Sequence, residues 1–161
     1  MNLKKRLIYE GKAKKIFEHD ETDKVIIEFK DDATAFNSLK KARFRGKGEL
    51  NCQISINIFK YLIKHNIPTH FIDVQDNNSI ITHKVDIVPI EVVLRNIAYG
   101  SICRQTNIKP GTILKEPLID FYLKDDALED PLLTKERIKL LEIIDMKELQ
   151  NIENTTHKIN K

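Results

Sequence analysis

The sequence predicts an α+β protein, in which an antiparallel-sheet lobe precedes the start of a second α+β lobe. Short segments rich in β-branched and aromatic residues, such as "KVIIEFK" at 24–30, indicate strands. One long helical pattern, at 48–65, interrupts the strands. The strands and helices do not alternate regularly, which argues against a parallel sheet built from βαβ units.

The first elements follow from turn residues and periodicity. Residues 7–17, "LIYEGKAKKIF", predict two strands joined by a glycine turn, and 24–30 predict a third strand. The polar segment "DDATAFNS" at 31–38 indicates a loop. The helix at 48–65 ends where "HNIP" supplies an asparagine and then a proline. Its expected apolar stripe consists of Leu50, Ile54, Ile58, Leu62, Phe59 and Ile63.

Two further strands, at 69–75 and 79–84, are joined by a "DNN" turn, and the stretch 87–101 begins with another strand. Alternation in this last strand places Glu91 and Arg95 together on the face opposite the more apolar one. Along a straight strand these two residues lie about 13 Å apart, too far to pair with each other. Each charge therefore needs a separate protein partner or a ligand.

The last third predicts a turn at 107–114, a short strand with an acidic loop at 117–133, and two helices. Asp145 and Glu148 fit a capping box at the start of the final helix. The apolar face of that helix is expected to contain Leu149, Ile152 and Ile159. The pattern reaches Lys161 without a glycine or proline stop signal, so we expect a chain that belongs to a longer protein.

Composition excludes several classes of protein. The 161 residues are 41% hydrophobic and 32% charged, as in a globular domain, and no apolar run approaches the roughly 20 residues of a membrane span. A net charge of +3, from 27 basic and 24 acidic residues, is too even to indicate a nucleic-acid binder. Cys52 and Cys103 have no metal-ligand spacing, and we expect a reducing, cytoplasmic setting.

Two segments have residues suited to a nucleotide. The hairpin "YEGKAKKIF" could meet phosphates with backbone N–H groups and lysines, or it could be an ordinary hairpin with surface lysines. The connection "HKVDIVPIE" could present backbone groups to an adenine edge, or it could be a plain connector. Neither segment decides the function alone.

Three other segments could bind anions or metals. Arg95 and Ser101, with Gly100 between them, suit a phosphate or carboxylate, although Ser101 could cap a helix and Arg95 could pair with an acid. The acids of "KDDATAF" and "LKDDALEDP" could hold Mg²⁺ or lie in solvated turns. The segment "RFRGKGELN" could be a phosphate-binding helix entrance or an exposed basic turn.

Five segments in this order resemble the SAICAR synthetase family, the ATP-dependent ligases of purine biosynthesis that form phosphoribosylaminoimidazole-succinocarboxamide. They are "YEGKAKKIF", "FKDDATAFN", "KGELNCQIS", "KVDIVPIEVVLRNIAYGS" and "FYLKDDALEDP". The resemblance implies a SAICAR synthase-like fold, similar to kinase and ATP-grasp lobes. It further implies an ATP-binding lobe at 1–86 and the start of a substrate-binding lobe at 87–161.

The resemblance also implies roles for individual residues. A loop covering the ATP phosphates would consist of Gly11, Lys12, Ala13 and Lys14. The segment that meets adenine would consist of Lys84, Val85, Asp86 and Ile87. Arg95 and Ser101 would hold the phosphate of carboxyaminoimidazole ribotide (CAIR), with Arg95 unpaired within its own strand, and Glu91 would orient a neighbouring group. Lys124 and Asp130 would lie near the imidazole and the reacting carboxylate.

The family reaction joins CAIR to L-aspartate through an acyl phosphate and yields SAICAR, ADP and phosphate, with Mg²⁺ beside ATP. Family members are usually longer, so the metal ligands are expected beyond Lys161. The implied partners are small molecules, with no nucleic acid and no membrane, and a homo-oligomer is allowed. One alternative is a nucleotide-binding fragment without ligase activity. A second is a basic RNA-binding protein using "KARFRGK", which lacks interleaved aromatic residues.

Overall fold

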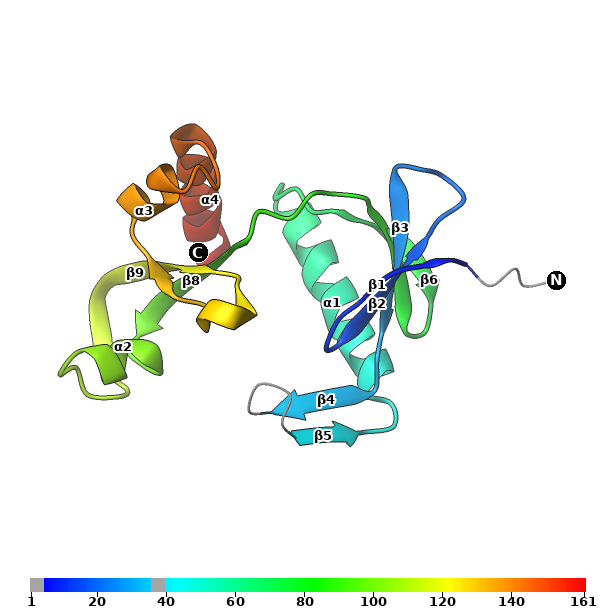
Figure 1. Cartoon of the computed structure of the whole chain (residues 1–161), viewed down its shortest axis with the longest axis horizontal. Helices are drawn as coiled ribbons and strands as arrows, with labels where there is room; N and C mark the ends of the chain where they lie inside the picture. The colour runs from blue at the N-terminus through cyan, green and yellow to red at the C-terminus, as the bar shows by residue number, and fades with distance from the viewer. Residues whose placement is uncertain (1–4, 36–39) are drawn as a thin grey trace. The chain divides into compact units, whose positions relative to one another are not determined.

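The computed structural model describes residues 5–35 and 40–161 and divides the chain into two compact units (Figure 1). The first unit ends at Asp86, and the second comprises Ile87–Lys161. Both contain antiparallel strands and helices, so the predicted α+β class is confirmed. The functional roles assigned above to the two parts stay predictions.

The first unit is built on a five-stranded antiparallel sheet in the order β1-β2-β3-β7-β6. Its strands are β1 (Leu7–Glu10), β2 (Lys14–Glu18), β3 (Lys24–Phe29), β6 (Phe71–Asp76) and β7 (Ser79–His83). The predicted glycine hairpin and the "DNN" hairpin are both present, as β1–β2 and β6–β7. β3 lies at the centre because its alternate residues Val25, Ile27 and Phe29 are buried on one face.

Helix α1 (Lys47–Lys64) covers that face of the sheet (Figure 1). Its buried residues are Gly48, Cys52 and Ile56, whereas four residues of the predicted stripe are 47–58% exposed, namely Leu50, Ile54, Ile58 and Ile63. The predicted stripe is therefore wrong for these four positions. A Cβ at Gly48 would lie 2.4 Å from the Phe29 carbonyl oxygen, so this glycine lets the helix turn its 48–52–56 face to the sheet.

A small hairpin replaces part of the loop predicted at 31–38. β4 (Asp32–Ala35) pairs with β5 (Lys40–Arg43), which brings Asp32 opposite Arg43. The loop prediction is therefore wrong for 32–35, while 36–38 lie outside the described residues. The low strand propensity of this polar sequence gave no sign of the hairpin, which is held by backbone hydrogen bonds between its two strands.

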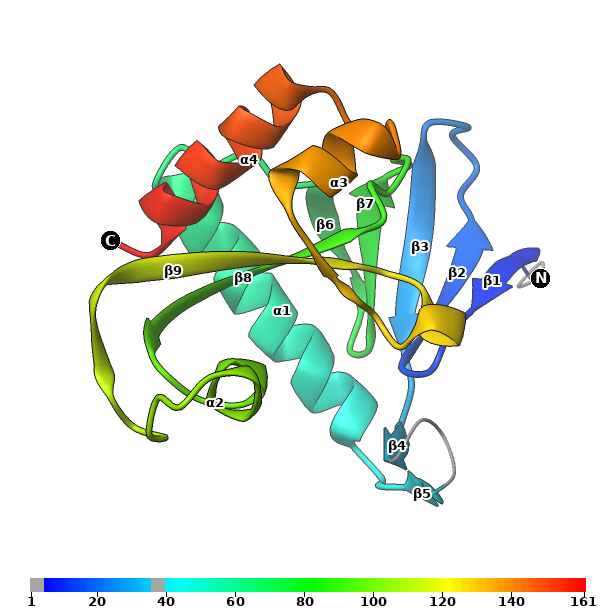
Figure 2. The ribbon, with the colours of Figure 1, turned by 60° about the vertical axis from the view of Figure 1, so that its left-hand side comes forward.

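The second unit contains a three-stranded antiparallel sheet in the order β10-β9-β8 (Figure 2). Its elements are β8 (Ile90–Ile97), α2 (Ser101–Gln105), β9 (Ile113–Leu123), the 3₁₀ turn η1 (Asp126–Leu128), β10 (Leu132–Leu133), α3 (Lys135–Leu140) and α4 (Met146–Ile159). β9 is longer than the strand predicted there, because it pairs with β8 as far as Ile113 opposite Ile97. α2 lies in the connection between these two strands.

The core of the second unit lies on one face of β8 and β9. Phe121, Leu133, Ile138 and Leu149 are buried together, and apolar residues of β8 pack against them. The predicted alternation of β8 is thereby confirmed. The Asp145 side chain caps α4 by accepting hydrogen bonds from the backbone N–H groups of Lys147 and Glu148. The predicted apolar face is buried only at its start, because Ile159 is exposed.

Among the residues that the structure describes, every helix is too short or too polar to cross a bilayer.

Candidate functional site

The turn between β1 and β2 contains the residues predicted to cover the ATP phosphates. The Gly11 N–H donates to the Lys14 carbonyl oxygen at 2.9 Å, and the Lys30 N–H donates to the Ala13 carbonyl oxygen at 2.9 Å. Lys12, Ala13 and Lys14 are exposed. The Lys14 ammonium lies 5.0 Å from the centre of the Phe29 ring, a distance suited to a cation–π contact. Hydrogen bonds thus hold the loop backbone, while its residues 12–14 are exposed.

The segment predicted to meet adenine lies at the other end of β3. Lys14 pairs with Phe29 at one end of this strand, whereas the Lys84 N–H donates to the Asp23 carbonyl oxygen, 2.7 Å away, beside the other end. At the usual rise per residue the two ends are about 16 Å apart. A ligand that contacts both the loop and Lys84 must therefore lie extended along β3. Val85, Asp86 and Ile87 are exposed.

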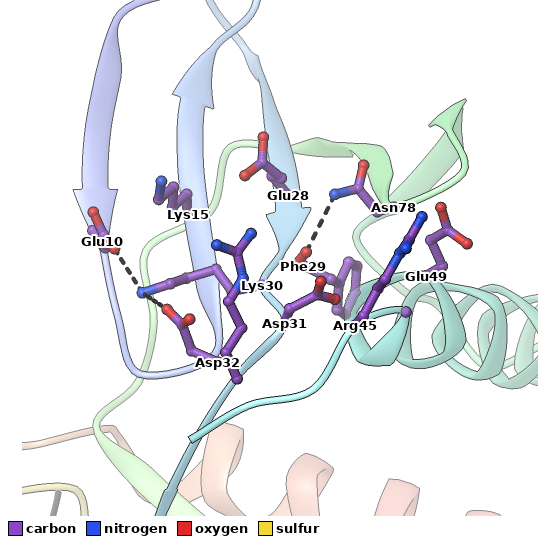
Figure 3. Close-up of a pocket in the computed structure, with 12 residues that line it drawn as sticks. Glu10, Lys15, Glu28, Phe29, Lys30, Asp31, Asp32, Arg45, Glu49 and Asn78 are labelled. Atoms are coloured by element: carbon purple, nitrogen blue, oxygen red, sulfur yellow. Dashed lines mark hydrogen bonds and ion pairs between the residues drawn. The ribbon is translucent and has the colours of Figure 1, made fainter. Parts of the chain in front are cut away.

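A pocket of about 520 Å³ lies beside the loop, between the sheet and the β4–β5 segment (Figure 3). Its lining is mostly charged and includes Glu10, Lys15, Lys30, Asp32 and Arg45. Glu10 and Lys15 flank the loop, but the predicted ATP-binding residues are not among the lining residues of this pocket. The described pocket therefore does not coincide with the predicted ATP phosphate site.

In the second unit, β8, β9 and the start of α2 bring four polar side chains together. Arg95 forms an ion pair with Asp120, and its other terminal nitrogen donates to the Ser101 hydroxyl at 3.1 Å and to the Tyr122 hydroxyl at 3.4 Å. The two hydroxyl oxygens are themselves 2.8 Å apart. The side chains of Arg95 and Asp120 are only 14% and 15% exposed. We call Arg95, Ser101, Asp120 and Tyr122 the arginine cluster.

Arg95 pairs with an acid outside its own strand, which is one of the alternatives that the sequence left open. Its own strand offers none, but β9 supplies Asp120, which lies opposite Val93 and on the same face as Arg95. Sequence reasoning also missed Tyr122. The signal was present in "DFY", because Asp120 and Tyr122 are two apart on one strand and so share a face. The pairing register needed to place them beside Arg95 was not readable across the α2 connection.

A second cluster joins the residues predicted near the reacting carboxylate. The Lys124 ammonium lies 3.1 Å from an Asp130 carboxylate oxygen and 3.3 Å from one of Glu91. Hydrogen bonds to Asp130 and then Glu91 raise the pKa of Lys124 above its ordinary value. Glu129 and Asp130 both have positive φ, and this turn lets Asp130 also accept from the Asp125 N–H at 2.9 Å. Lys124 is thus a cation at neutral pH, held between two carboxylates.

The acidic segments have structural partners. Asp125 accepts hydrogen bonds at the start of η1 from the Ala127 and Leu128 N–H groups. Asp31 accepts one from the Gly48 N–H at 2.9 Å and so holds the start of α1. Over residues 5–35 and 40–161, no group of three histidine, cysteine or acidic side chains is placed to hold a metal ion.

The basic segment 41–47 lies among acidic partners. Arg43 is opposite Asp32 in the β4–β5 hairpin, and the Lys47 ammonium donates to the Asp32 carbonyl oxygen at 3.0 Å. Arg45 lines the pocket described above together with several carboxylates. This mixed environment does not favour a continuous cationic surface for RNA.

Comparison with known proteins points to one family. A family model described as SAICAR synthetase matches residues 7–161. The phosphoribosylaminoimidazole-succinocarboxamide synthase of Prochlorococcus marinus subsp. pastoris is 68% identical over 161 residues, which cover the whole chain and 66% of that relative. The synthase of the same name from Synechocystis sp. is 48% identical over 99% of the chain and 61% of its own length.

Solved structures agree with these relatives. A structure described as SAICAR synthetase (Type-2) in complex with ADP is 46% identical, with a TM-score of 0.90 over 96% of this chain and 65% of that one. The phosphoribosylaminoimidazole-succinocarboxamide synthase of Ehrlichia chaffeensis is 42% identical, with a TM-score of 0.91 over the same shares. The chain thus spans somewhat less than two thirds of the length of the relatives that it matches.

Proposed function

The chain belongs to the SAICAR synthetase family, and we propose that it serves the ATP-dependent joining of CAIR to L-aspartate. The γ-phosphoryl group of ATP passes to an oxygen of the CAIR carboxylate, which gives an acyl phosphate and ADP. The aspartate amine then attacks the carbonyl carbon. A C–N bond forms, the C–O bond to phosphate breaks, and the amine loses a proton as SAICAR and inorganic phosphate are released.

The arginine cluster carries this proposal, because it suits the ribotide phosphate. Arg95 has five N–H donors, and Asp120 fixes one end of its planar fork. The hydroxyl groups of Ser101 and Tyr122 lie beside the other end and can also donate. A fixed guanidinium with neighbouring hydroxyls is well suited to bidentate phosphate binding in a partly desolvated place.

The Lys124 cluster supports a role beside the CAIR carboxylate. Its raised pKa keeps Lys124 cationic, so it can offset negative charge but cannot accept a proton. Glu91 and Asp130 hold the ammonium from two sides, which fixes its position before substrate binds. We assign Lys124 and Asp130 to the reacting end of CAIR and Glu91 to positioning Lys124.

ATP is assigned to the first unit. The Gly11–Lys14 loop offers backbone N–H groups and lysines to phosphates, and Lys84, Val85, Asp86 and Ile87 are assigned to adenine. A relative that is 46% identical is described in complex with ADP. When bound, Mg²⁺ would neutralise phosphate charge during transfer. We assign none of the described residues to hold the ion, since no group of three histidine, cysteine or acidic side chains gathers among them.

The setting that fits this chemistry is cytoplasmic, with small anionic partners. CAIR and aspartate supply the atoms of SAICAR, and ATP supplies the phosphoryl group, so neither nucleic acid nor a membrane is needed. Both cysteines are free thiols. We also propose that a homo-oligomer forms, and light scattering of the purified chain across a concentration series tests this. A constant monomer mass at every concentration would contradict it.

The proposal is tested by incubating the 161-residue chain with CAIR, L-aspartate, ATP and Mg²⁺, and separating SAICAR and ADP by chromatography. We expect both products to appear together and to require every substrate. ADP binding without SAICAR would favour the alternative of a nucleotide-binding fragment, since the chain spans 66% of its Prochlorococcus relative. RNA binding that resists high salt, without either activity, would favour the second alternative.

A further inference from the structure

Lys30 links the end of β3 to the turn between β1 and β2 (Figure 3). Its ammonium lies 2.6 Å from a Glu10 carboxylate oxygen and 2.8 Å from one of Asp32. The side chain is only 15% exposed, although both acidic partners are more open to solvent. Lys30 therefore joins Glu10 and Asp32, which are 22 residues apart in the sequence.

The same residue also holds the loop backbone. The Lys30 N–H donates to the Ala13 carbonyl oxygen at 2.9 Å, and the ammonium lies 3.4 Å from the Gly11 carbonyl oxygen. Lys30 thus contacts the strand before the loop, through Glu10, and both sides of the loop itself. These contacts hold a segment in which Lys12, Ala13 and Lys14 are exposed.

The contacts of Lys30 account for all of its donors. A lysine ammonium has three N–H donors, and Glu10, Asp32 and the Gly11 carbonyl oxygen can take one each. No donor then remains for a phosphate. Lys30 is also more buried than Lys12 and Lys14, which are exposed.

We propose that Lys30 is a positioning residue, which holds the Gly11–Lys14 loop in the conformation that receives the nucleotide phosphates. This inference rests on the proposed nucleotide-binding function. A loop already held in its bound shape loses less conformational entropy when a ligand arrives, and so binds more tightly. Lys30 also neutralises Glu10, whose negative charge would otherwise repel phosphates beside the loop.

The electrostatics of the cluster agree with this role. Hydrogen bonds to Lys30 lower the pKa of both Glu10 and Asp32, and the nearby cations Lys15 and Arg43 act in the same direction on Asp32. Hydrogen bonds to Asp32 and Glu10 raise the pKa of Lys30. All three groups are therefore charged at neutral pH, which makes the hydrogen bonds between them charge-assisted and strong.

Lys30→Met tests the proposal, with Lys30→Arg as the conservative variant and Lys24→Met as the matched control. Lys24 is the first residue of β3, whereas Lys30 directly follows the last one. Lys24 also forms a 2.6 Å ion pair, with Glu21, at the strand end away from the loop. Hydrogen exchange of the peptide covering residues 10–14 measures loop opening. Calorimetric titration with ADP measures nucleotide affinity.

We expect the loop amides of Lys30→Met to exchange faster with solvent. We also expect this variant to bind ADP about tenfold more weakly, which is the lower end of the usual loss in affinity when a hydrogen bond to a charged group is removed. Lys30→Arg should restore most of both properties, because a guanidinium can bridge two carboxylates. Lys24→Met should match the unchanged chain in both measurements. Glu10→Gln keeps the lysine and should also loosen the loop, so it decides the question if Lys30→Met does not fold.

Unchanged loop exchange in Lys30→Met, or in Glu10→Gln where the first variant is unfolded, would overturn the proposal. Faster exchange with unchanged ADP affinity would overturn the link between loop position and nucleotide binding. Failure of the unchanged chain to bind ADP would instead contradict the proposed function. The exchange measurement would still show in that case whether Lys30 holds the loop.

Discussion

Asp120 on β9 forms an ion pair with Arg95 on β8, although the two residues are 25 positions apart in the sequence. Both side chains are mostly buried, so the pair is poorly screened by solvent. The Asp120 side chain therefore has two roles. It stabilises the sheet of the second unit, and it fixes the guanidinium that we assign to the ribotide phosphate.

Asp120→Asn should lower the free energy of unfolding by about 1.5–3 kcal/mol, the usual range for a hydrogen bond to a charged group. The amide keeps the shape of the side chain but leaves the Arg95 charge without its counterion. Urea unfolding followed by circular dichroism measures the change. Glu116→Gln, at an exposed position on the same strand, is the control and should change little. Equal stability of Asp120→Asn and the unchanged chain would show that the ion pair contributes nothing.

Gly48→Ala should destabilise the first unit by about 1–3 kcal/mol, the usual cost of overpacking. The added Cβ would lie 2.4 Å from the Phe29 carbonyl oxygen, which is backbone and cannot turn aside. Gly46→Asn is the control, because Gly46 has open space around it and asparagine tolerates its positive φ. Thermal unfolding compares the variants. A melting temperature for Gly48→Ala equal to that of the control would contradict the close packing of α1 on β3.

The strands and helix α1 differ in how well the sequence predicts them. The strands were predictable wherever β-branched residues alternate between faces, as in β3 and β8. The buried face of α1 was not, because it is formed by Gly48, Cys52 and Ile56 rather than by the larger residues of the expected stripe. A glycine that permits close backbone approach leaves no hydrophobic signal.

The candidate site was predictable in its parts and not in its pairings. Arg95 and Ser101 could be named from a local motif, and the family resemblance added Glu91, Lys124 and Asp130. The partners on β9 depend on how that strand aligns with β8, and hydrogen-bond register across a long connection is set by packing of the whole sheet. The same reason explains why the ion pair between Lys30 and Glu10 was not anticipated.

Cys52 should react with thiol reagents much more slowly than Cys103. Cys52 has no exposed surface, and its burial, followed by the charge of Asp76, raises the pKa of its thiol. Cys103 is half-buried and accessible. Mass spectrometry after timed labelling distinguishes the two sites, and Cys103→Ser removes the faster one. Rapid labelling of Cys52 in folded Cys103→Ser would contradict the packing of α1 on the sheet.

The ion pairs of Lys30 with Glu10 and Asp32 should stop stabilising the fold in acid. The folded-state pKa values of Glu10 and Asp32 lie below their ordinary values of 4.5 and 3.8. Their contribution to stability is therefore fully present above those ordinary values and is lost as the pH falls through the lowered ones. We expect the difference in unfolding free energy between Lys30→Met and the unchanged chain to shrink on acidification. Urea unfolding across this range measures it, and a difference that stays constant would refute the ionic account.

The central claim, that the arginine cluster binds the ribotide phosphate, is tested most directly by calorimetric titration of CAIR and of its nucleoside without the phosphate. The unchanged chain should bind CAIR clearly more tightly than the nucleoside. Arg95→Lys keeps the charge but loses the planar fork, and it should weaken CAIR binding by about tenfold or more while hardly changing nucleoside binding. Arg104→Lys, at an exposed position of α2, is the control. Equal affinity of Arg95→Lys and the unchanged chain for CAIR would contradict the account.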